Sequence, residues 1–356
     1  MSTLLRVDDL TVSFATEDGV VQAVGGVSFE LHAGEVLAIV GESGSGKSVT
    51  AQTITGLTRA PNARITGAVT YRGRELNELD DDQLRDVRGE QIAMVFQDPM
   101  SSLNPVYRVG DQIAEMIRAH RDVSKREAQD RAVELLRSVG IPNPEGRVRH
   151  YPHEFSGGMR QRVMIAMALA LEPEVLIADE PTTALDVTVQ AQILRLIDQL
   201  NRDRDLAVIL ITHDLGVVAE VADRVLVMYA GQIVEDATLD ETFYDPQHPY
   251  TWGLLGSLMR LDQSRSTRLA QIPGQPPSLL APPTGCRFAP RCPYAFDKCH
   301  ELPSLEARVG GNHLDRCWLD PEEKKSLRAQ VIPRVRAIRC WRSPTSSSTS
   351  RSSPGW

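Results

Sequence analysis

The sequence predicts an α/β fold, a layered domain with a largely parallel sheet followed by a less regular C-terminal extension. Three observations predict it. Up to about Asp240, short β-rich runs alternate with helical stretches, and one long helical insertion separates two of the runs. Beyond Asp240, prolines interrupt the regular patterns. With 356 residues, of which 42% are hydrophobic, the chain can form about two domains with a buried core.

The clearest buried strands are four apolar runs, at residues 36–40, 92–96, 175–178 and 208–212. Between the second and third runs, apolar residues recur at helical spacing from Ala128 to Val139, and Gly140 and Pro142 end the pattern. We therefore expect a helical subdomain over about residues 98–172. A further apolar stripe, from Val189 to Leu200, is interpreted as ordinary core packing.

Composition and charge exclude several classes of protein. The longest strictly apolar run, residues 163–171, is about half of what a membrane-crossing helix needs, and the N-terminus lacks a secretory signal pattern. We therefore expect a soluble intracellular protein. A net charge of -8 argues against a nucleic-acid partner that needs a broad basic face. Five cysteines are too few for a disulfide scaffold in a chain of this length.

A glycine-rich loop follows the first buried strand and precedes a helix expected over residues 49–57. It reads Gly41-Glu42-Ser43-Gly44-Ser45-Gly46-Lys47-Ser48 and fits the phosphate-loop pattern G-x-x-x-x-G-K-[ST]. Because Gly44 and Gly46 lack β-carbons, consecutive backbone N–H groups can point at phosphate oxygens. We expect Lys47 to hold the β- and γ-phosphates and Ser48 to ligate Mg²⁺. The loop therefore predicts that the chain binds a nucleotide.

Two adjacent carboxylates end the third buried strand. Asp179 is placed to bind Mg²⁺ through its water shell, and Glu180 is free to polarise a water for in-line attack on the γ-phosphorus. Two acids at an exposed strand end can also be merely structural. The intact phosphate loop favours the catalytic interpretation.

A second candidate anion site lies at residues 155–161, which read Phe-Ser-Gly-Gly-Met-Arg-Gln and precede an apolar helix. Ser156, Gly157 and Gly158 open this helix, so its N-terminal N–H groups and dipole favour phosphate. The segment resembles the signature motif of ATP-binding cassette (ABC) proteins. In that family the signature of one cassette covers the γ-phosphate held by the phosphate loop of another. The resemblance therefore implies that one cassette is half of an active ATPase.

The remaining family elements occur in the expected order. Phe14 matches the aromatic residue that stacks on adenine, although alone it could belong to the core. Gln97 matches the glutamine that senses Mg²⁺ and the attacking water, and residues 183–186 match the loop that joins two cassettes. His213 matches the histidine that contacts the γ-phosphate and orients Glu180. The resemblance implies a phosphate-loop NTPase cassette over residues 1–240, with a RecA-like core sheet and the helical subdomain. Met159 departs from the glutamine that many cassettes carry there, and we expect activity to be retained.

Other segments resemble one branch of the family, the oligopeptide/dipeptide importer ATPases. They are residues 97–105, 248–251, 273–277 and 285–293. The resemblance implies an ATP-hydrolysing subunit, peripheral to the cytoplasmic side of the membrane, that energises uptake of di- or oligopeptides. Its implied partners are a second, identical or similar, ABC ATPase subunit, two transmembrane permease subunits and, through the permease, an extracytoplasmic solute-binding protein. Relatives with the same appendix serve nickel or other small solutes.

Four cysteines cluster in the extension, residues 241–320. Cys286, Cys292, Cys299 and Cys317 are separated by five, six and seventeen residues, so the Cys-x-x-Cys spacing usual for structural zinc is missing. Some members of this importer branch carry a four-cysteine [4Fe–4S] cluster here, and the resemblance implies one in this chain. Free or partly buried thiols and a zinc site are the alternatives.

We expect the last segment, residues 321–356, to be a disordered tail, because it is basic and its end is rich in Ser, Thr and Pro. From Lys324 onward it has eight basic residues and no acidic ones, so it is interpreted as solvated or as attracted to an anionic membrane surface. Two rival functions remain for the chain. A non-transport ABC ATPase predicts a second cassette, a coiled coil or a basic face, and an inert regulatory subunit predicts loss of catalytic residues.

Overall fold

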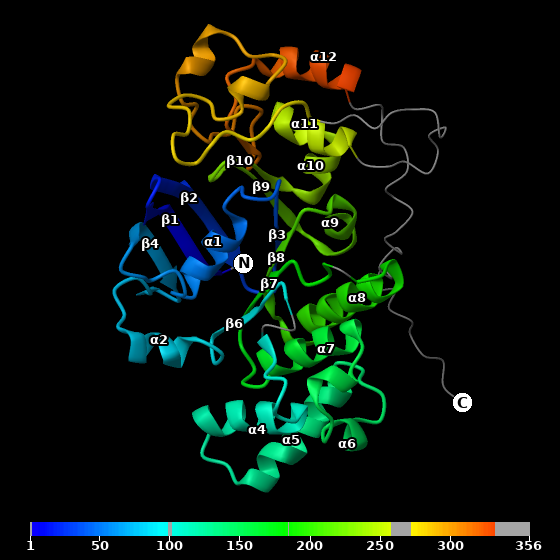
Figure 1. Cartoon of the computed structure of the whole chain (residues 1–356). Helices are drawn as coiled ribbons and strands as arrows, with labels where there is room; N and C mark the ends of the chain where they lie inside the picture. The colour runs from blue at the N-terminus through cyan, green and yellow to red at the C-terminus, as the bar shows by residue number, and fades with distance from the viewer. Residues whose placement is uncertain (1, 99–101, 184, 258–271, 332–356) are drawn as a thin grey trace, which may run out of the picture.

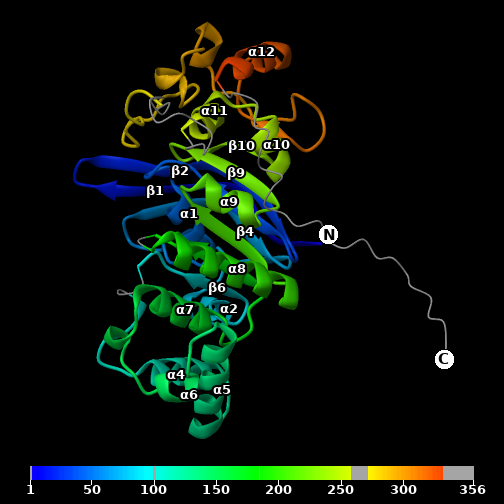
Figure 2. The same cartoon turned by 90° about the vertical axis from the view of Figure 1, so that its right-hand side faces the viewer.

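The computed structural model describes residues 2–98, 102–183, 185–257 and 272–331. Two sheets form the centre, with a helical region at one end and the C-terminal extension at the other (Figures 1 and 2). Within these ranges, no helix combines the length and the hydrophobicity needed to cross a membrane. The arrangement agrees with the predicted α/β class, and the four predicted strands are confirmed.

The larger sheet has seven strands in the order β11-β10-β9-β3-β8-β7-β6. Parallel pairing joins β9, β3, β8, β7 and β6, whereas β10 and β11 are antiparallel additions. The strands are β3 (Val36–Val40), β6 (Ile92–Val95), β7 (Val175–Asp179), β8 (Ala207–Thr212), β9 (Arg224–Tyr229), β10 (Gln232–Thr238) and β11 (Leu314–Asp315). Every residue of β3, β7 and β8 is buried, because helices or the second sheet cover both faces, and their sequences are accordingly continuous apolar runs. The phosphate loop, Glu180 and His213 follow these three strands at the same edge.

The second sheet is antiparallel and is not predicted by the sequence patterns. Its strands, in the order β2-β1-β4-β5, are β1 (Thr3–Thr16), β2 (Gly19–His32), β4 (Ala63–Tyr71) and β5 (Arg74–Glu75). Bulges shift the register of β1 at several points, which disrupts the simple alternation that would predict a strand from sequence. Leu10 and Val27 of this sheet share a core with Ile39 of β3 and Ile54 of α1 (Lys47–Ile54).

Helices α7 (Gly157–Ala168), α8 (Val187–Arg204) and α9 (Leu215–Val221) lie on the other face of the large sheet (Figure 1). The helical region at one end consists of α4 (Val109–His120), α5 (Lys125–Ser138) and α6 (Pro144–Arg147). A shorter helix, α2 (Asp81–Val87), packs into the core under the antiparallel sheet, and η1 (Pro152–Glu154) precedes α7. The two apolar stripes found in the sequence lie on α5 and α8 and face one core. A Ser124–Glu127 capping box starts α5, and Gly140 follows its end with a φ of 74°.

The extension is more regular than expected. It contains most of α10 (Leu239–Tyr244), α11 (Pro249–Gly256) and the short turns η2 (Ala289–Arg291) and η3 (Asp297–His300), and α12 (Pro321–Val331) follows it. It also supplies β11, which extends the large sheet by pairing with β10. Tyr229 of β9 joins Tyr250, Trp252 and Phe288 of the extension in a third core. The extension is therefore packed on the cassette by its own aromatic cluster.

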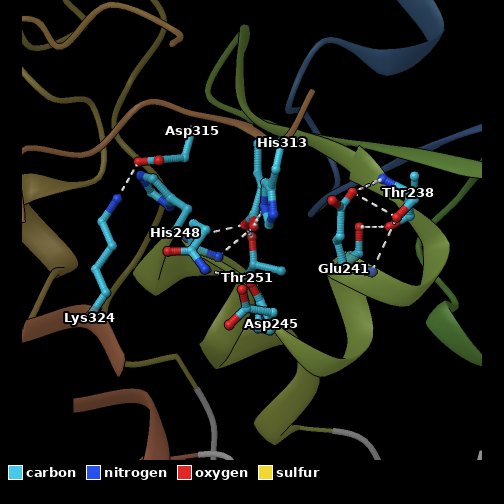
Figure 3. Close-up of polar contacts among 12 residues, drawn as sticks. Thr238, Glu241, Asp245, His248, Thr251, His313, Asp315 and Lys324 are labelled. Atoms are coloured by element: carbon cyan, nitrogen blue, oxygen red, sulfur yellow. Dashed lines mark hydrogen bonds and ion pairs between the residues drawn. The ribbon is translucent and has the colours of Figure 1, made fainter. Parts of the chain in front are cut away.

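The expectation of a disordered tail from residue 321 is wrong for residues 321–331, which form α12. Lys324 is fully buried and its ammonium lies 2.6 Å from the carboxylate of Asp315 on β11 (Figure 3). Arg328 pairs with Asp245 at the end of α10. Acidic partners on β11 and at the end of α10 therefore hold two of the basic residues interpreted as solvated or membrane-attracted. Residues 332–356, with Cys340, lie outside the described residues.

Candidate nucleotide site

The phosphate loop connects the end of β3 to α1 through backbone conformations that require glycine. Gly41 and Gly46 have φ values of 154° and 98°. A β-carbon on Gly41 would lie 2.1 Å from the carbonyl oxygen of Met228, and one on Gly46 would lie 2.5 Å from that of Ala23. The loop is thus closely fitted against β2 and β9. Ser43 and Gly44 are exposed, whereas Ser45 is buried.

Lys47, the first residue of α1, is buried against the loop. Its ammonium donates hydrogen bonds to the carbonyl oxygens of Gly41, at 2.8 Å, and Glu42, at 2.9 Å. Burial lowers the pKa of Lys47, while the carboxylates of Glu180, Asp179 and Glu42 act in the opposite direction. The charge that would meet a phosphate is therefore held in place by the loop itself.

Ser48 and Asp179 meet at the junction of α1 and β7. The Ser48 hydroxyl donates a 3.0 Å hydrogen bond to Asp179, whose side chain is buried. Burial raises the pKa of Asp179, and the hydrogen bond from Ser48 opposes this. A hydroxyl and a carboxylate oxygen are hard donors of the kind that Mg²⁺ takes, so these two residues could hold the metal of a Mg–nucleotide complex.

The remaining candidate catalytic side chains lie around Glu180. Its carboxylate accepts hydrogen bonds of 2.9 Å from Gln97 and from Thr183, and it lies 3.3 Å from Nδ1 of His213. Its backbone is left-handed, with a φ of 47°, a strained conformation for a non-glycine residue. The Glu180 N–H donates to Ile211 of β8, which helps to hold this conformation. The structure thus brings Gln97 and His213 to Glu180. It places neither in a hydrogen bond with Ser48 or Asp179.

The signature residues occupy a separate, exposed position at the start of α7. Ser156 caps this helix by accepting the N–H of Met159, and a β-carbon on Gly158 would lie 2.3 Å from Val189 of α8. Ser156 and Gly157 are exposed. Both views show α7 apart from α1 (Figures 1 and 2), and in the described ranges no hydrogen bond joins residues 155–161 to the phosphate loop.

Other predicted site residues are placed as follows. Phe14 lies on β1, half-buried and packed against the core shared with α1. Of the loop at residues 183–186, Ala184 lies outside the described residues, and Asp186 caps α8. Cys286, Cys292, Cys299 and Cys317 line one cavity of about 10 Å³ and form no disulfide. In the part of the chain that the structure describes, no three His, Cys, Asp or Glu side chains are arranged to hold a metal ion.

Three side chains at the site are not predicted by the sequence patterns. Thr183 was noted only as part of a loop, although it lies three residues after Glu180 and contacts it. Tyr250 and Arg291 of the extension both contact Glu42 in the phosphate loop, across 208 and 249 residues of sequence. No local pattern signals contacts over such separations.

Two family models match the chain. Residues 24–183 match the model described as ABC transporter, and residues 234–299 match the one described as oligopeptide/dipeptide transporter, C-terminal region. The oligopeptide transport ATP-binding protein OppD of Bacillus subtilis is 56% identical over 320 residues, which cover 90% of this chain and 89% of OppD. The chain belongs to the family of ABC transporter ATP-binding proteins. The dipeptide transport ATP-binding protein DppD of the same organism is 53% identical and covers 90% of this chain and 96% of DppD.

Solved ABC cassettes share the fold. The dimeric structure of the cassette MJ0796 superposes with a TM-score of 0.60 at 30% identity, covering 66% of this chain and 98% of that one. A second dimeric structure of MJ0796, in a post-hydrolysis state with ADP and Pi, also has a TM-score of 0.60, at 29% identity with the same coverage. This ABC protein is accordingly an ATPase cassette with an additional C-terminal region.

Proposed function

We propose that this chain is the ATP-hydrolysing subunit of an ABC importer that energises uptake of di- or oligopeptides. The main support for this proposal is that four side chains lie together at one edge of the large sheet: Lys47, Ser48, Asp179 and Glu180. In addition, the extension of the chain matches the oligopeptide/dipeptide transporter region. Relatives at more than half identity are named for oligopeptide or dipeptide transport. The complete set of catalytic side chains argues against an inert regulatory subunit.

The contacts support a specific division of roles. Lys47 and the loop N–H groups bind the β- and γ-phosphates, and Ser48 and Asp179 would hold Mg²⁺. Magnesium supplies charge neutralisation on the triphosphate. Glu180 accepts the proton of the attacking water, while His213 and Gln97 orient its carboxylate. Electrostatic positioning contributes most of the rate enhancement, because phosphoryl transfer needs little covalent help from protein.

A second cassette completes the site in this proposal. Ser156, Gly157 and Gly158 are outward-facing N-terminal residues of a helix, suited to binding the γ-phosphate of a partner chain. Phe14 stacks on adenine. The helical subdomain contacts one of two permease subunits at the cytoplasmic face of the membrane. Through the permease, an extracytoplasmic solute-binding protein delivers the solute.

The proposal extends to the four cysteines, whose sulfur atoms would be the ligands of a [4Fe–4S] cluster. The donors suit iron, and all four line one cavity without forming a disulfide. The described geometry does not fit a bound cluster, because a cavity of about 10 Å³ holds roughly one water. Burial also raises the pKa of Cys292 and of Cys317 to about 12, which opposes the thiolate form. The lining would have to open, and no step of ATP hydrolysis is routed through the cluster. Iron and sulfide analysis of anaerobically purified protein tests whether the cluster is present. A colourless, iron-free product would exclude the cluster.

Co-purification with the permease, followed by uptake in a deletion strain, tests the transport function. Wild-type chain should restore uptake of labelled di- and oligopeptides, and Glu180→Gln should not. Restored nickel uptake without peptide uptake would contradict the peptide assignment. Failure to co-purify with any membrane protein, together with intact ATPase activity, would support a non-transport ABC ATPase.

A further inference from the structure

Glu42, the second residue of the phosphate loop, is attached to the C-terminal extension by two contacts. Its backbone N–H donates a 2.8 Å hydrogen bond to the hydroxyl of Tyr250 on α11. Its carboxylate accepts two hydrogen bonds from Arg291 at the end of η2, at 2.7 and 3.1 Å. The third polar group of Glu42, its carbonyl, accepts from Lys47. The residue therefore joins the extension directly to the lysine of the nucleotide site.

Arg291 is itself held in a fixed position. Its side chain is 5% exposed, and it also donates to the carbonyl oxygens of Pro273 and Ile272. Its guanidinium lies over the ring of Tyr229, 5.7 Å from the centroid. Tyr250, fully buried, packs on the same ring at a centroid distance of 4.6 Å. A planar, bidentate cation anchored in this way restricts the Glu42 carboxylate to one orientation.

The negative charge of Glu42 explains why its pairing with Arg291 matters for nucleotide binding. A carboxylate in a loop that binds a triphosphate repels the ligand, and Glu42 is only partly exposed, so water screens it incompletely. A paired Arg291 neutralises that charge. The pairing also fixes the loop segment whose carbonyl oxygen accepts the hydrogen bond from Lys47. The entropy cost of ordering this segment when the nucleotide binds is therefore smaller.

We propose that Arg291 is a positioning residue for nucleotide binding, which acts through Glu42 to neutralise and preorganise the phosphate loop. The proposal rests on the ATP-binding role of that loop. The described hydrogen bonds of Arg291 go to Glu42, to Tyr229 and to two carbonyl oxygens of the extension, and not to Glu180, so the effect falls on affinity rather than on the chemical step. The extension thereby contributes to the ATP site of the cassette on which it packs.

The test measures Mg·ATP affinity by calorimetry, with KM and kcat measured separately, on the full chain with its co-purified partners. Arg291→Met should raise Kd and KM about tenfold while kcat stays within about twofold, because one charge-assisted pair is lost. Adding Glu42→Gln to this variant removes the unpaired carboxylate and should return Kd to within about threefold of wild type.

Arg316→Met is the matched control. Arg316 is another poorly exposed arginine of the extension, but it donates to the carbonyl oxygens of Ile233 and Pro303 and not to the phosphate loop. The Arg316→Met variant should leave the Kd for Mg·ATP within about twofold of the wild-type value. Unchanged affinity in Arg291→Met, no rescue by Glu42→Gln, or an equal loss in Arg316→Met would each overturn the proposal. A wild-type chain that does not bind ATP would instead overturn the proposed function.

Discussion

Glu180 combines an unfavourable backbone conformation with three side-chain contacts. A left-handed residue at the end of a strand turns the chain sharply, and so the carboxylate meets Gln97, Thr183 and His213 rather than continuing the line of β7. Strain of this kind costs of order 1–3 kcal/mol and persists only where surrounding contacts hold it. Here the hydrogen bond to Ile211 and the contacts of the carboxylate do so.

Glu180→Gln tests the proposed base. Glutamine retains the size and the hydrogen-bonding reach of Glu180 but cannot accept a proton from water, so turnover should fall by about a hundredfold or more. Binding of Mg·ATP should persist, since Lys47, Ser48 and Asp179 are unchanged. Phosphate release and equilibrium nucleotide binding measured on the same preparation separate the two effects. Turnover equal to that of wild type would remove Glu180 from the base role.

Helix α11 depends on a histidine that must remain neutral. Nδ1 of His248 accepts the N–H of Tyr250 as the helix cap, and His248 is buried (Figure 3). Burial, assisted by Lys324 and Arg316, lowers the pKa of His248 to about 3. The unfolded chain protonates this residue near its usual value of 6.5. Between pH 6.5 and 3, the unfolded state therefore binds one proton more at His248 than the folded state does. The free energy of unfolding that neutral His248 contributes is fully present above pH 6.5 and is lost as the pH falls toward 3.

His248→Asn separates the cap from the titration. Asparagine is a good helix N-cap but does not titrate, so the unfolding free energy of the variant should depend less on pH between 6.5 and 4.5 than that of wild type. Denaturant unfolding at several pH values measures the difference, which should approach about 1.4 kcal/mol for each pH unit. Parallel curves for the two proteins would assign the acid sensitivity to other groups.

The buried ion pair of Lys324 and Asp315 joins α12 to β11. Both side chains are fully buried, and one carboxylate oxygen of Asp315 has no hydrogen-bond partner. Lys324→Met should lower the unfolding free energy by about 3 kcal/mol, because it removes the hydrogen-bonding cation of a buried carboxylate and leaves only the Arg308 guanidinium, 3.8 Å away. Asp315→Asn in the same chain should recover part of that loss. Thermal or denaturant unfolding provides the measurement, and a single variant as stable as wild type would show that this pair does not hold the extension in place.

At the scale of the whole molecule, two candidate phosphate-binding helix ends lie on one chain without meeting. The phosphate loop precedes α1, and the exposed Ser156 caps α7 elsewhere in the cassette (Figure 1). A site that needs both ends must draw the second from another chain. Under the proposed function, a single copy is therefore catalytically incomplete.

Turnover per chain should therefore rise with protein concentration as dimers form. At dilutions where light scattering or mass photometry shows only monomers, turnover should be a few per cent or less of that of the assembled complex. Ser156→Arg blocks the outward-facing helix end while leaving the phosphate loop intact, and it should abolish this gain. Strictly monomeric wild-type protein that hydrolyses ATP at the rate of the complex would disprove the shared site.

Local pattern alone determined much of this protein. Short, continuous apolar runs predicted the parallel strands, because a strand that is buried on both faces has no polar side, and glycine spacing predicted the phosphate loop. Only tertiary structure decided which distant groups meet. Gln97 reaches Glu180 across 83 residues, Arg291 reaches Glu42 across 249, and Lys324 became a buried ion-pair partner instead of part of a solvated tail. The reason is that a run or a motif depends on neighbouring residues, whereas compensation of a buried charge depends on packing between elements that no sequence spacing encodes.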